Sequence, residues 1–269
     1  MIRGAVLGSP ISHSLSPTLH SSAYQFLGIQ GEYSAQEVPA GSLNSFISSQ
    51  GDNFDYLSLT MPLKEEVLSL EVECDDLTRR IQSGNTLVRT NDAWKLTSTD
   101  GSGFVSALLQ SGITKMSSVL ILGAGGTARA VAGALDSLAG EIVVLGRSSV
   151  REDALRSAVK ISRFHYRKWS LDIDFSQYQL VINTTPAGAA DLLANSVHPG
   201  LSTILFDVIY KPWPTELAKR WSDCGGQVIN GLELLLYQGI DQLEIVLGRP
   251  LDRAALASHL RPILEKAAR

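Results

Sequence analysis

The sequence predicts an α/β protein with two domains, each built on a mainly parallel sheet covered by helices. Short apolar strands alternate with helical segments in two series along the chain. The first series is at 2–7, 17–27, 32–38, 40–49 and 55–60, and the second has strands at 119–122, 141–145, 180–183 and 203–206. This alternation is typical of parallel sheets. Two amphipathic helices at 232–247 and 252–268 are expected to return to the first domain.

The second series begins with a glycine-rich turn directly after a buried strand. The run Gly123-Ala124-Gly125-Gly126-Thr127-Ala128 has G-x-G-x-x-A spacing and leads into an Ala-rich helix expected to end near Leu138. In a dinucleotide-binding turn the glycines let the backbone approach a pyrophosphate, and the helix N-terminus offers free N–H groups to it. A glycine-rich turn in some other α/β unit would show the same spacing. The residues after the next strand are needed to distinguish the two.

The strand at 141–145 ends in a basic segment. Gly146-Arg147-Ser148-Ser149 follows it, with Arg151 close behind. NAD-binding folds usually place an acidic residue here for the ribose 2′-hydroxyl. Guanidinium and hydroxyl groups suit a 2′-phosphate instead, through charge-assisted hydrogen bonds. The alternative is an ordinary solvated loop. The predicted cofactor is NADP.

The first series contains four residues that could perform chemistry. Ser14 and Ser16 are two apart, so in an extended segment both hydroxyls could hold a carboxylate; alternatively, Ser16 caps the following helix. Lys64 follows the carboxyl end of a strand, where open α/β sheets bind ligands, although a lone lysine is usually surface charge. Asp100 is either a helix cap or an active-site carboxylate. His13 and His20 show no metal-ligand spacing, and we expect them on the surface or packed against a helix.

Composition limits the function classes. The chain has 269 residues, 44% hydrophobic and 19% charged, with a net charge of −4. It shows no Lys/Arg block, no apolar run of membrane-spanning length and no targeting segment, and its two cysteines are far apart. We therefore expect a cytoplasmic enzyme acting on a small molecule, without nucleic-acid, membrane or metal binding.

Motifs distributed along the whole chain resemble those of the shikimate dehydrogenase family. They are Gly8-Ser9-Pro10-x-x-His13-Ser14-x-Ser16-Pro17-x-x-His20, Thr60-x-Pro62-x-Lys64, Gly84-Asn85-Thr86-Leu87, Thr99-Asp100-Gly101, the glycine-rich turn, Asp207-x-x-Tyr210-x-Pro212-x-x-Thr215 and Gly231-x-x-x-Leu235-x-x-Gln238. The resemblance implies a substrate domain at 1–100 and 232–269 and a Rossmann-type NADP-binding domain at 101–231. It also implies reversible NADPH-dependent reduction of 3-dehydroshikimate to shikimate in aromatic amino-acid biosynthesis, by a monomer or homodimer.

The same resemblance assigns roles to particular residues. Lys64 and Asp100 match the catalytic pair. The substrate-binding positions are Ser14, Ser16, Thr60, Asn85, Tyr210 and Gln238. The cofactor-binding positions are Gly123, Ala124, Gly125, Gly126, Thr127, Ala128, Arg147, Ser148, Arg151, Thr184, Val208 and Gly231.

Five positions depart from the commonest family pattern. Ser58 and Gly146 stand where asparagine is frequent, Ser98 stands where an Asn-Thr-Asp run usually begins, and Ala189 and Leu234 stand where methionine is common. Two other functions remain open. One is a related NAD-dependent quinate/shikimate dehydrogenase, and the other is a catalytically silent paralogue that senses a ligand, which the presence of Lys64 and Asp100 disfavours.

Overall fold

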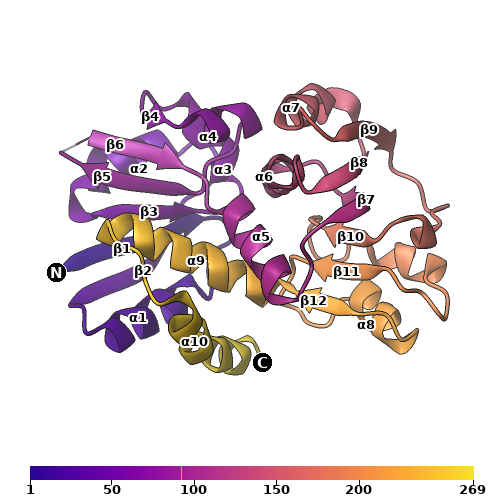
Figure 1. The fold of residues 1–269 in the computed structure, drawn as a ribbon. Coiled ribbons are helices and arrows are strands. Elements are labelled where there is room, and N and C mark those ends of the chain that lie inside the picture. The colour runs from indigo at the N-terminus through magenta and orange to yellow at the C-terminus, as the bar shows by residue number, and fades with distance from the viewer. Residues whose placement is uncertain (92) are drawn as a thin grey trace. The chain divides into compact units, whose positions relative to one another are not determined.

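The computed structural model describes residues 1–91 and 93–269. The sequence predicts a hairpin of two strands at 83–89 and 94–97 around the turn Asn91-Asp92, and Asp92 lies outside the described residues. The chain forms two compact units (Figure 1). The first consists of Met1–Gly103 and Leu235–Arg269, and the second of Phe104–Leu234. Helix α5 (Asp100–Gln110) leads from the first unit into the second, and α9 (Gly231–Leu247) leads back. The predicted α/β fold class is confirmed.

The sheet of the first unit is mixed. Its described strands lie in the order β2-β1-β3-β5-β6-β4. They are β1 (Ile2–Gly8), β2 (Gly31–Glu37), β3 (Tyr56–Leu59), β4 (Glu73–Cys74), β5 (Thr86–Thr90) and β6 (Ala93–Thr97). Strands β1, β2 and β3 pair in parallel, but β5 is antiparallel to both β3 and β6. The mainly parallel arrangement is thus confirmed for β1, β2 and β3. Strands β5 and β6 depart from it because strands joined by a tight hairpin must run in opposite directions.

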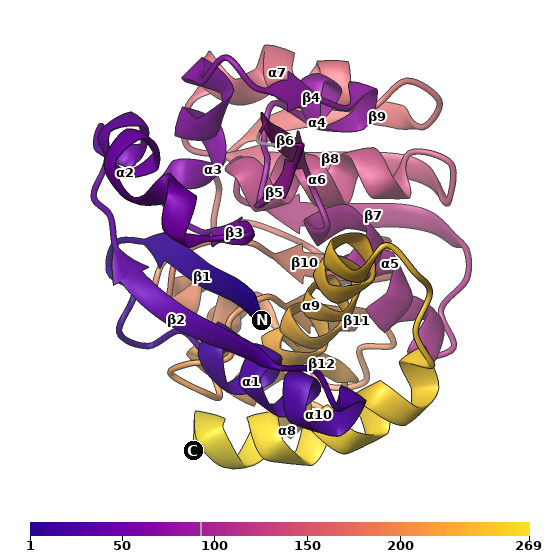
Figure 2. The same cartoon turned by 90° about the vertical axis from the view of Figure 1, so that its left-hand side faces the viewer.

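Helices cover both faces of this sheet. They are α1 (Ser16–Leu27), α2 (Leu43–Gln50), α3 (Leu63–Glu66), α4 (Asp76–Ile81) and α10 (Arg253–Ala268), with 3-10 turns η1 (Gly51–Asn53) and η2 (Val67–Ser69). Apolar side chains from β1, β3, β5 and β6 pack with those of α2 and α3 in one core. Figure 2 shows α1 and α10 side by side, and residues of these two helices are in contact.

The second unit contains a sheet in which every described pair of strands is parallel. The order is β12-β11-β10-β7-β8-β9. The strands are β7 (Met116–Leu122), β8 (Ala139–Gly146), β9 (Arg163–Lys168), β10 (Leu180–Asn183), β11 (Ile204–Asp207) and β12 (Val228–Asn230). The strand order reverses between β7 and β10. Open α/β sheets bind ligands beyond the carboxyl ends of the strands at such a switch point.

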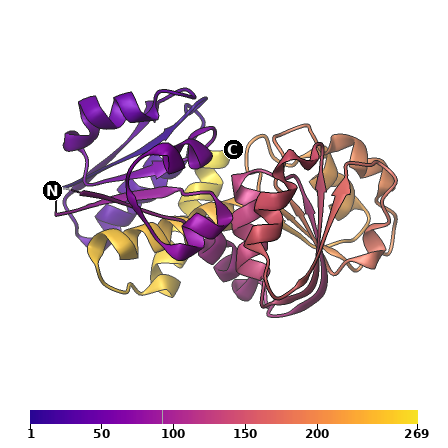
Figure 3. The same cartoon turned by 90° about the horizontal axis from the view of Figure 1, so that it is seen from above.

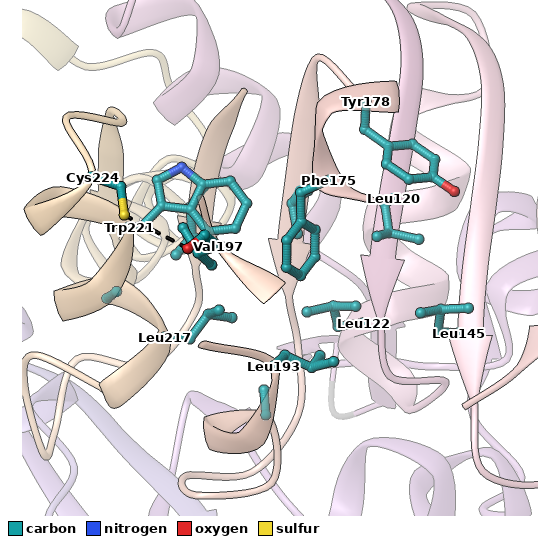
Figure 4. Packing of buried hydrophobic residues seen from close by; sticks show 14 of the residues in the cluster. Leu120, Leu122, Leu145, Phe175, Tyr178, Leu193, Val197, Leu217, Trp221 and Cys224 are labelled. Carbon is teal, nitrogen blue, oxygen red and sulfur yellow. Dashed lines mark hydrogen bonds between the residues drawn. The ribbon is translucent and has the colours of Figure 1, made fainter. Parts of the chain in front are cut away.

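Helical segments lie on both faces of the second sheet (Figure 3). They are α6 (Gly126–Leu135), α7 (Glu152–Ala158), α8 (Glu216–Asp223) and the 3-10 turns η3 (Ser149–Arg151), η4 (Phe175–Gln177) and η5 (Asp191–Ser196). Figure 4 shows the core beneath α8, where Phe175 and Trp221 pack with their rings tilted and their centroids 5.0 Å apart. The Trp221 indole N–H donates to the carbonyl of Thr203, which joins α8 to the start of β11.

Several element boundaries differ from the expectations. The helix expected at 40–49 begins at Leu43. The sequence also predicts a helix at 151–160, where the structure has the short α7 preceded by η3. Strand β4 and helices α3 and α4 were missed. Helix α4 had a usable signal, because Asp75 caps it by accepting a hydrogen bond from the Thr78 N–H at 2.7 Å. Within the described residues, no helix has the length and apolar character needed to cross a membrane.

Candidate active site

Two charged side chains meet in the first unit at the ends of short helices. Lys64 lies in α3, just beyond the carboxyl end of β3, and Asp100 is the first residue of α5. The Lys64 ammonium nitrogen Nζ lies 2.5 Å from Asp100 Oδ2. Their side chains are only 17% and 5% exposed. Lys64 is thus held in a buried ion pair, which an isolated surface lysine would not form.

Asn85 fixes the other side of the carboxylate. Its amide Nδ2 donates to Asp100 Oδ1 at 2.9 Å and also lies 3.0 Å from Thr99 Oγ1. Its amide oxygen accepts from the Thr99 backbone N–H at 2.8 Å. The segments before β5 and before α5 are therefore tied together by one buried side chain. Asp100 accepts a hydrogen bond at each carboxylate oxygen, so Lys64 and Asn85 together fix the orientation of its side chain.

Gln238 reaches the same cluster from α9. Its Oε1 lies 3.3 Å from Asn85 Nδ2 and 3.4 Å from Thr99 Oγ1. Helices α5 and α9 approach closely here, because a Cβ at Gly103 would lie 2.5 Å from the Gln238 backbone nitrogen. Four predicted residues, Lys64, Asn85, Asp100 and Gln238, are thereby brought together from four separate segments of the chain.

The other positions of this unit that are predicted to bind substrate lie on different segments. Ser14 is half-buried in the loop before α1, and its hydroxyl accepts from the Ser16 N–H at 3.3 Å. The helix-cap interpretation of Ser16 is wrong: Leu15 is the N-cap residue, and Ser16 already belongs to the helix. Thr60 is half-buried directly after β3, where its N–H donates to the carbonyl of Leu7 at 2.9 Å.

A buried aromatic and polar cluster behind these residues was not predicted. His20 is fully buried and stacks on Tyr33 with ring centroids 4.1 Å apart, while its Nδ1 lies 2.8 Å from the Tyr56 hydroxyl. Burial lowers the pKa of His20 from 6.5 to about 3. It raises the pKa values of Tyr33 and Tyr56 above their ordinary value of 10. All three groups are therefore neutral near pH 7.

Hydrogen bonds connect this cluster to Asn85 and through it to Asp100. The Tyr33 hydroxyl donates to Ser58 Oγ at 2.6 Å, and Ser58 donates to Gln242 Oε1 at 2.8 Å. Gln242 in turn donates to Thr86 Oγ1 at 2.8 Å, and Thr86 donates to Asn85 Oδ1 at 2.9 Å. The usable sequence signal was the pair Tyr56 and Ser58, because residues two apart in a strand face the same side.

The glycine-rich turn of the second unit has the features expected of a phosphate cradle. Gly123 adopts φ +103°, and a Cβ there would lie 2.7 Å from Thr184 Oγ1. Gly125 is the N-cap of α6, and the nearest atom to a Cβ at that position would be Arg151 Nη1 at 3.6 Å. Ala128 is fully buried where α6 packs on the sheet. The turn thus leaves backbone N–H groups of α6 beside a guanidinium, which suits an anion.

The ends of β10 and β11 are joined by a buried carboxylate. Asp207 accepts hydrogen bonds from Asn183 Nδ2 at 3.1 Å, the Ile209 N–H at 3.1 Å and Thr215 Oγ1 at 2.7 Å. Burial raises the pKa of Asp207, and the bonds from Thr215, Ile209 and Asn183 oppose the rise. The motif residues Asp207 and Thr215 thus shape the loop that contains Tyr210.

The remaining cofactor positions flank this loop. The Thr184 hydroxyl donates to the carbonyl of Leu122 at 2.8 Å, directly before the glycine-rich turn. The Val208 N–H donates to the carbonyl of Asn183 at 3.0 Å, and the Gly231 N–H donates to that of Ile209 at 3.3 Å. Gly231 packs directly on the Val208 carbonyl, so that no Cβ fits there. The predicted positions Thr184, Val208 and Gly231 therefore gather at the carboxyl ends of neighbouring strands.

The basic segment after β8 is exposed at each of its predicted contact residues. Arg147 and Ser148 follow the strand, and the Ser148 hydroxyl accepts from the Val150 N–H at 3.3 Å as the cap of η3. Arg151 ends that turn. No carboxylate occupies residues 146–151. The donor set therefore fits a dinucleotide bearing a 2′-phosphate. Residues 1–91 and 93–269 contain no group of three or more His, Cys, Asp and Glu able to hold a metal ion.

Comparison with known proteins identifies the family of this chain. The family model of the shikimate dehydrogenase substrate binding domain matches residues 6–87. A shikimate dehydrogenase (NADP(+)) of Thermosynechococcus vestitus is 34% identical to this chain. The alignment covers 96% of this chain and 94% of that protein.

Solved structures show the same fold. The shikimate 5-dehydrogenase of Thermus thermophilus, in complex with NADP(H) and shikimate, has a TM-score of 0.81 and 30% identity, covering 98% of this chain and all of that one. The ligand-free 5-ketofructose reductase of Gluconobacter sp. strain CHM43 has a TM-score of 0.80 and 25% identity, covering 97% and 98%. Since a relative more than 30% identical spans nearly its whole length, this chain belongs to the shikimate dehydrogenase family.

Proposed function

We propose that this protein catalyses the reversible NADPH-dependent reduction of 3-dehydroshikimate to shikimate, a step of aromatic amino-acid biosynthesis. The observation that supports it most directly is the buried pair of Lys64 and Asp100, 2.5 Å apart and bridged to Asn85, in a chain of the shikimate dehydrogenase family. The structure of the Thermus thermophilus relative contains both NADP(H) and shikimate.

The chemistry assigned to the pair follows from what the reaction requires. NADPH, when bound, supplies the hydride for the carbonyl carbon. Lys64 donates a proton to the carbonyl oxygen during reduction and accepts it from the hydroxyl during oxidation. Asp100 holds the Lys64 nitrogen in place, and Asn85 holds Asp100. A cation fixed at this position also stabilises negative charge that develops on the substrate oxygen.

Substrate recognition is assigned to uncharged polar side chains. The Ser14 and Ser16 hydroxyls are proposed to donate to the substrate carboxylate. The hydroxyls of the substrate are assigned to Thr60, Asn85 and Gln238, whose side chains can both donate and accept. Tyr210 is the substrate-binding position proposed in the second unit. A ketose such as 5-ketofructose has no carboxylate, so the serine pair favours shikimate over the substrate named for the Gluconobacter reductase.

The cofactor is proposed to bind the second unit. The backbone of Gly123–Ala128 receives the pyrophosphate at the start of α6. The exposed side chains of Arg147, Ser148 and Arg151 receive the 2′-phosphate through charge-assisted hydrogen bonds. Thr184, Val208 and Gly231 lie at the strand ends toward which the nicotinamide half would extend. Action in the cytoplasm, a monomeric or homodimeric state and the lack of nucleic-acid partners remain predictions.

One assay tests the proposal against its alternatives. Initial rates are measured with shikimate and with quinate, each with NADP and with NAD, and reduction is measured with 3-dehydroshikimate and 5-ketofructose. We expect the highest kcat/KM for the shikimate–NADP pair. Preference for NAD or quinate would indicate the related quinate/shikimate dehydrogenase. Binding of NADPH without turnover of any substrate would indicate the silent paralogue.

A further inference from the structure

We propose that Tyr166 and Gly146 form a coupled pair that holds the 2′-phosphate clamp in its binding conformation, with Tyr166 as a positioning residue for NADP selectivity. The clamp means Arg147, Ser148 and Arg151. The inference rests on the proposed function, because it needs these three residues to bind the 2′-phosphate.

The pair arises from the register of two parallel strands. Val144 of β8 is paired with Tyr166 of β9, and Gly146 is paired with Lys168. Side chains two residues apart in a strand face the same side of the sheet, so the Tyr166 side chain can extend over Gly146. The Trp169 N–H donates to the Gly146 carbonyl at 2.9 Å and continues the pairing to the end of β8. Strand β9 therefore delivers a large side chain to the base of the clamp.

Gly146 supplies space rather than backbone freedom. Its φ lies outside the left-handed region that favours glycine, so an alanine would adopt the same backbone conformation. A Cβ at this position, however, would overlap the Tyr166 hydroxyl oxygen and lie 2.6 Å from the ring carbon Cζ. The family pattern has a frequent asparagine here, which cannot coexist with Tyr166 in this orientation. The two positions are therefore expected to change together.

The hydroxyl of Tyr166 holds the other side of Arg147. It donates to the carbonyl of Ser148 at 2.5 Å. Arg147 thus lies between Gly146, which packs against the Tyr166 ring, and Ser148, whose carbonyl accepts a hydrogen bond from the Tyr166 hydroxyl. Holding the backbone on both sides lowers the entropy that the loop loses when it binds an anion. The removal of this one hydrogen bond should weaken binding of the 2′-phosphate without changing any charge.

The Tyr166 phenol is in its donor form at neutral pH. Burial and the neighbouring Glu152 raise the pKa of Tyr166 above 10, while Arg151 has the opposite effect. The phenol therefore stays protonated at neutral pH and can donate to the Ser148 carbonyl.

The first test replaces only the hydroxyl. For Tyr166→Phe we expect the Kd for NADP, measured by calorimetric titration, to rise about 3- to 10-fold, as for one neutral hydrogen bond. The Kd for NAD and kcat at saturating NADP should be unchanged, because neither depends on the 2′-phosphate. The matched control is Tyr178→Phe, a phenol of the same unit outside the clamp, which should leave both Kd values unchanged. An equal loss of affinity for NADP and for NAD would overturn the proposal, because it would show that Tyr166 stabilises the fold and not the clamp.

The second test addresses the coupling. Gly146→Ala should weaken NADP binding because the new methyl group displaces Tyr166 from the clamp. In the double variant Gly146→Ala/Tyr166→Ala that conflict is absent, so its NADP affinity should be no lower than that of Tyr166→Ala alone. Additive losses would overturn the coupling. A wild-type enzyme that prefers NAD would overturn the proposed function itself, whereas NADP preference with an unaffected Tyr166→Phe variant would overturn only this inference.

Discussion

The proposed catalytic cluster of the first unit and the proposed phosphate clamp of the second differ in how their side chains are held. Asp100 and Asn85 are almost fully buried, and both are hydrogen-bonded to neighbouring side chains. Arg147 and Ser148 are exposed, and the arrangement around them fixes the backbone through Tyr166 and the cap of η3. In one region the side chains themselves are preorganised, and in the other the backbone is.

The difference follows from what each region must do. Proton transfer requires donor and acceptor atoms held within hydrogen-bond distance, so a lysine must be fixed by partners that are themselves fixed. A phosphate dianion brings two charges and a broad set of acceptors, and a flexible guanidinium can meet it from a correctly placed backbone. Replacing a catalytic side chain should therefore cost more than replacing a clamp side chain.

The largest effect is expected for Lys64→Ala. Without the proton donor, kcat should fall by about 10²- to 10⁴-fold, the usual contribution of a general acid–base group. The Kd for shikimate should change much less, because binding is assigned mainly to other residues. Steady-state kinetics and calorimetric titration measure the two quantities. The control is Lys95→Ala, which removes an exposed lysine of the same unit paired with Glu73. A Lys64→Ala variant with near-wild-type turnover would exclude the catalytic role.

The two regions were also unequally accessible to sequence analysis. The glycine-rich turn and Arg147 lie in local patterns, where spacing alone indicates a strand, a turn and a helix. Lys64 and Asp100 are 36 residues apart, and only the resemblance to the family suggested their pairing. His20 of helix α1 could not be placed from the sequence, because its burial depends on Tyr33 and Tyr56 from two separate strands. Side-chain contacts between residues far apart in the chain produce no periodic pattern in the sequence from which they could be predicted.

The mixed first sheet illustrates the same limit. Alternation of strands and helices identified β1, β2 and β3, and the hairpin of β5 and β6 was recognised from its turn. Periodicity does not show that β5 pairs with β3, since pairing partners depend on contacts between distant segments. The role of Gly146 was likewise hidden. It was recognised as a departure from the family pattern, but the residue that fills its space, Tyr166, lies on the next strand of the sheet.

The second largest effect is expected for Ser14→Ala/Ser16→Ala. Loss of two hydrogen bonds to a carboxylate should weaken shikimate binding by about 3 kcal/mol, or roughly 100-fold. NADP binding should be spared, and calorimetric titration measures both. The control Ser21→Ala/Ser22→Ala removes two hydroxyls from the same helix. If the serines served only the helix, the melting curve would show a loss of about 1 kcal/mol with unchanged shikimate affinity.

The cluster behind the catalytic residues predicts a pH dependence of stability. The unfolded chain protonates His20 near pH 6.5, whereas burial lowers the pKa of His20 in the folded state to about 3. Between these values the unfolded state binds more protons, so the free energy of unfolding falls as the pH falls. At about pH 5 this loss amounts to about 2 kcal/mol relative to about pH 7.5. Denaturant unfolding at several pH values measures it.

Substitution isolates the contribution of this histidine. His20→Gln should be less stable than wild type near neutral pH, because it loses packing against Tyr33, but its stability should depend less on pH across the same range. His259→Gln, on α10 where the ring stacks on Phe26, should keep the wild-type slope. An unchanged slope in His20→Gln would show that other groups cause the acid sensitivity, and that the catalytic cluster does not rest on a neutral buried histidine.

A smaller effect than for the Lys64 and Ser14/Ser16 substitutions is expected for Arg147→Ala, because this side chain is exposed. One charge-assisted contact contributes roughly 1.5 to 3 kcal/mol, and solvent exposure places Arg147 at the lower end, about tenfold in affinity for NADP. NAD binding should be nearly unchanged, since a guanidinium gains little from a 2′-hydroxyl. The NADP penalty should shrink as salt is raised, because counterions screen exposed charges. Calorimetric titration at low and high salt measures this. The control is Arg163→Ala, which removes an exposed arginine at the start of β9, at the end of the strand away from the clamp. A salt-independent loss shared by NADP and NAD would mean that Arg147 shapes the loop, and the contrast between a fixed catalytic side chain and a solvated clamp side chain would fail.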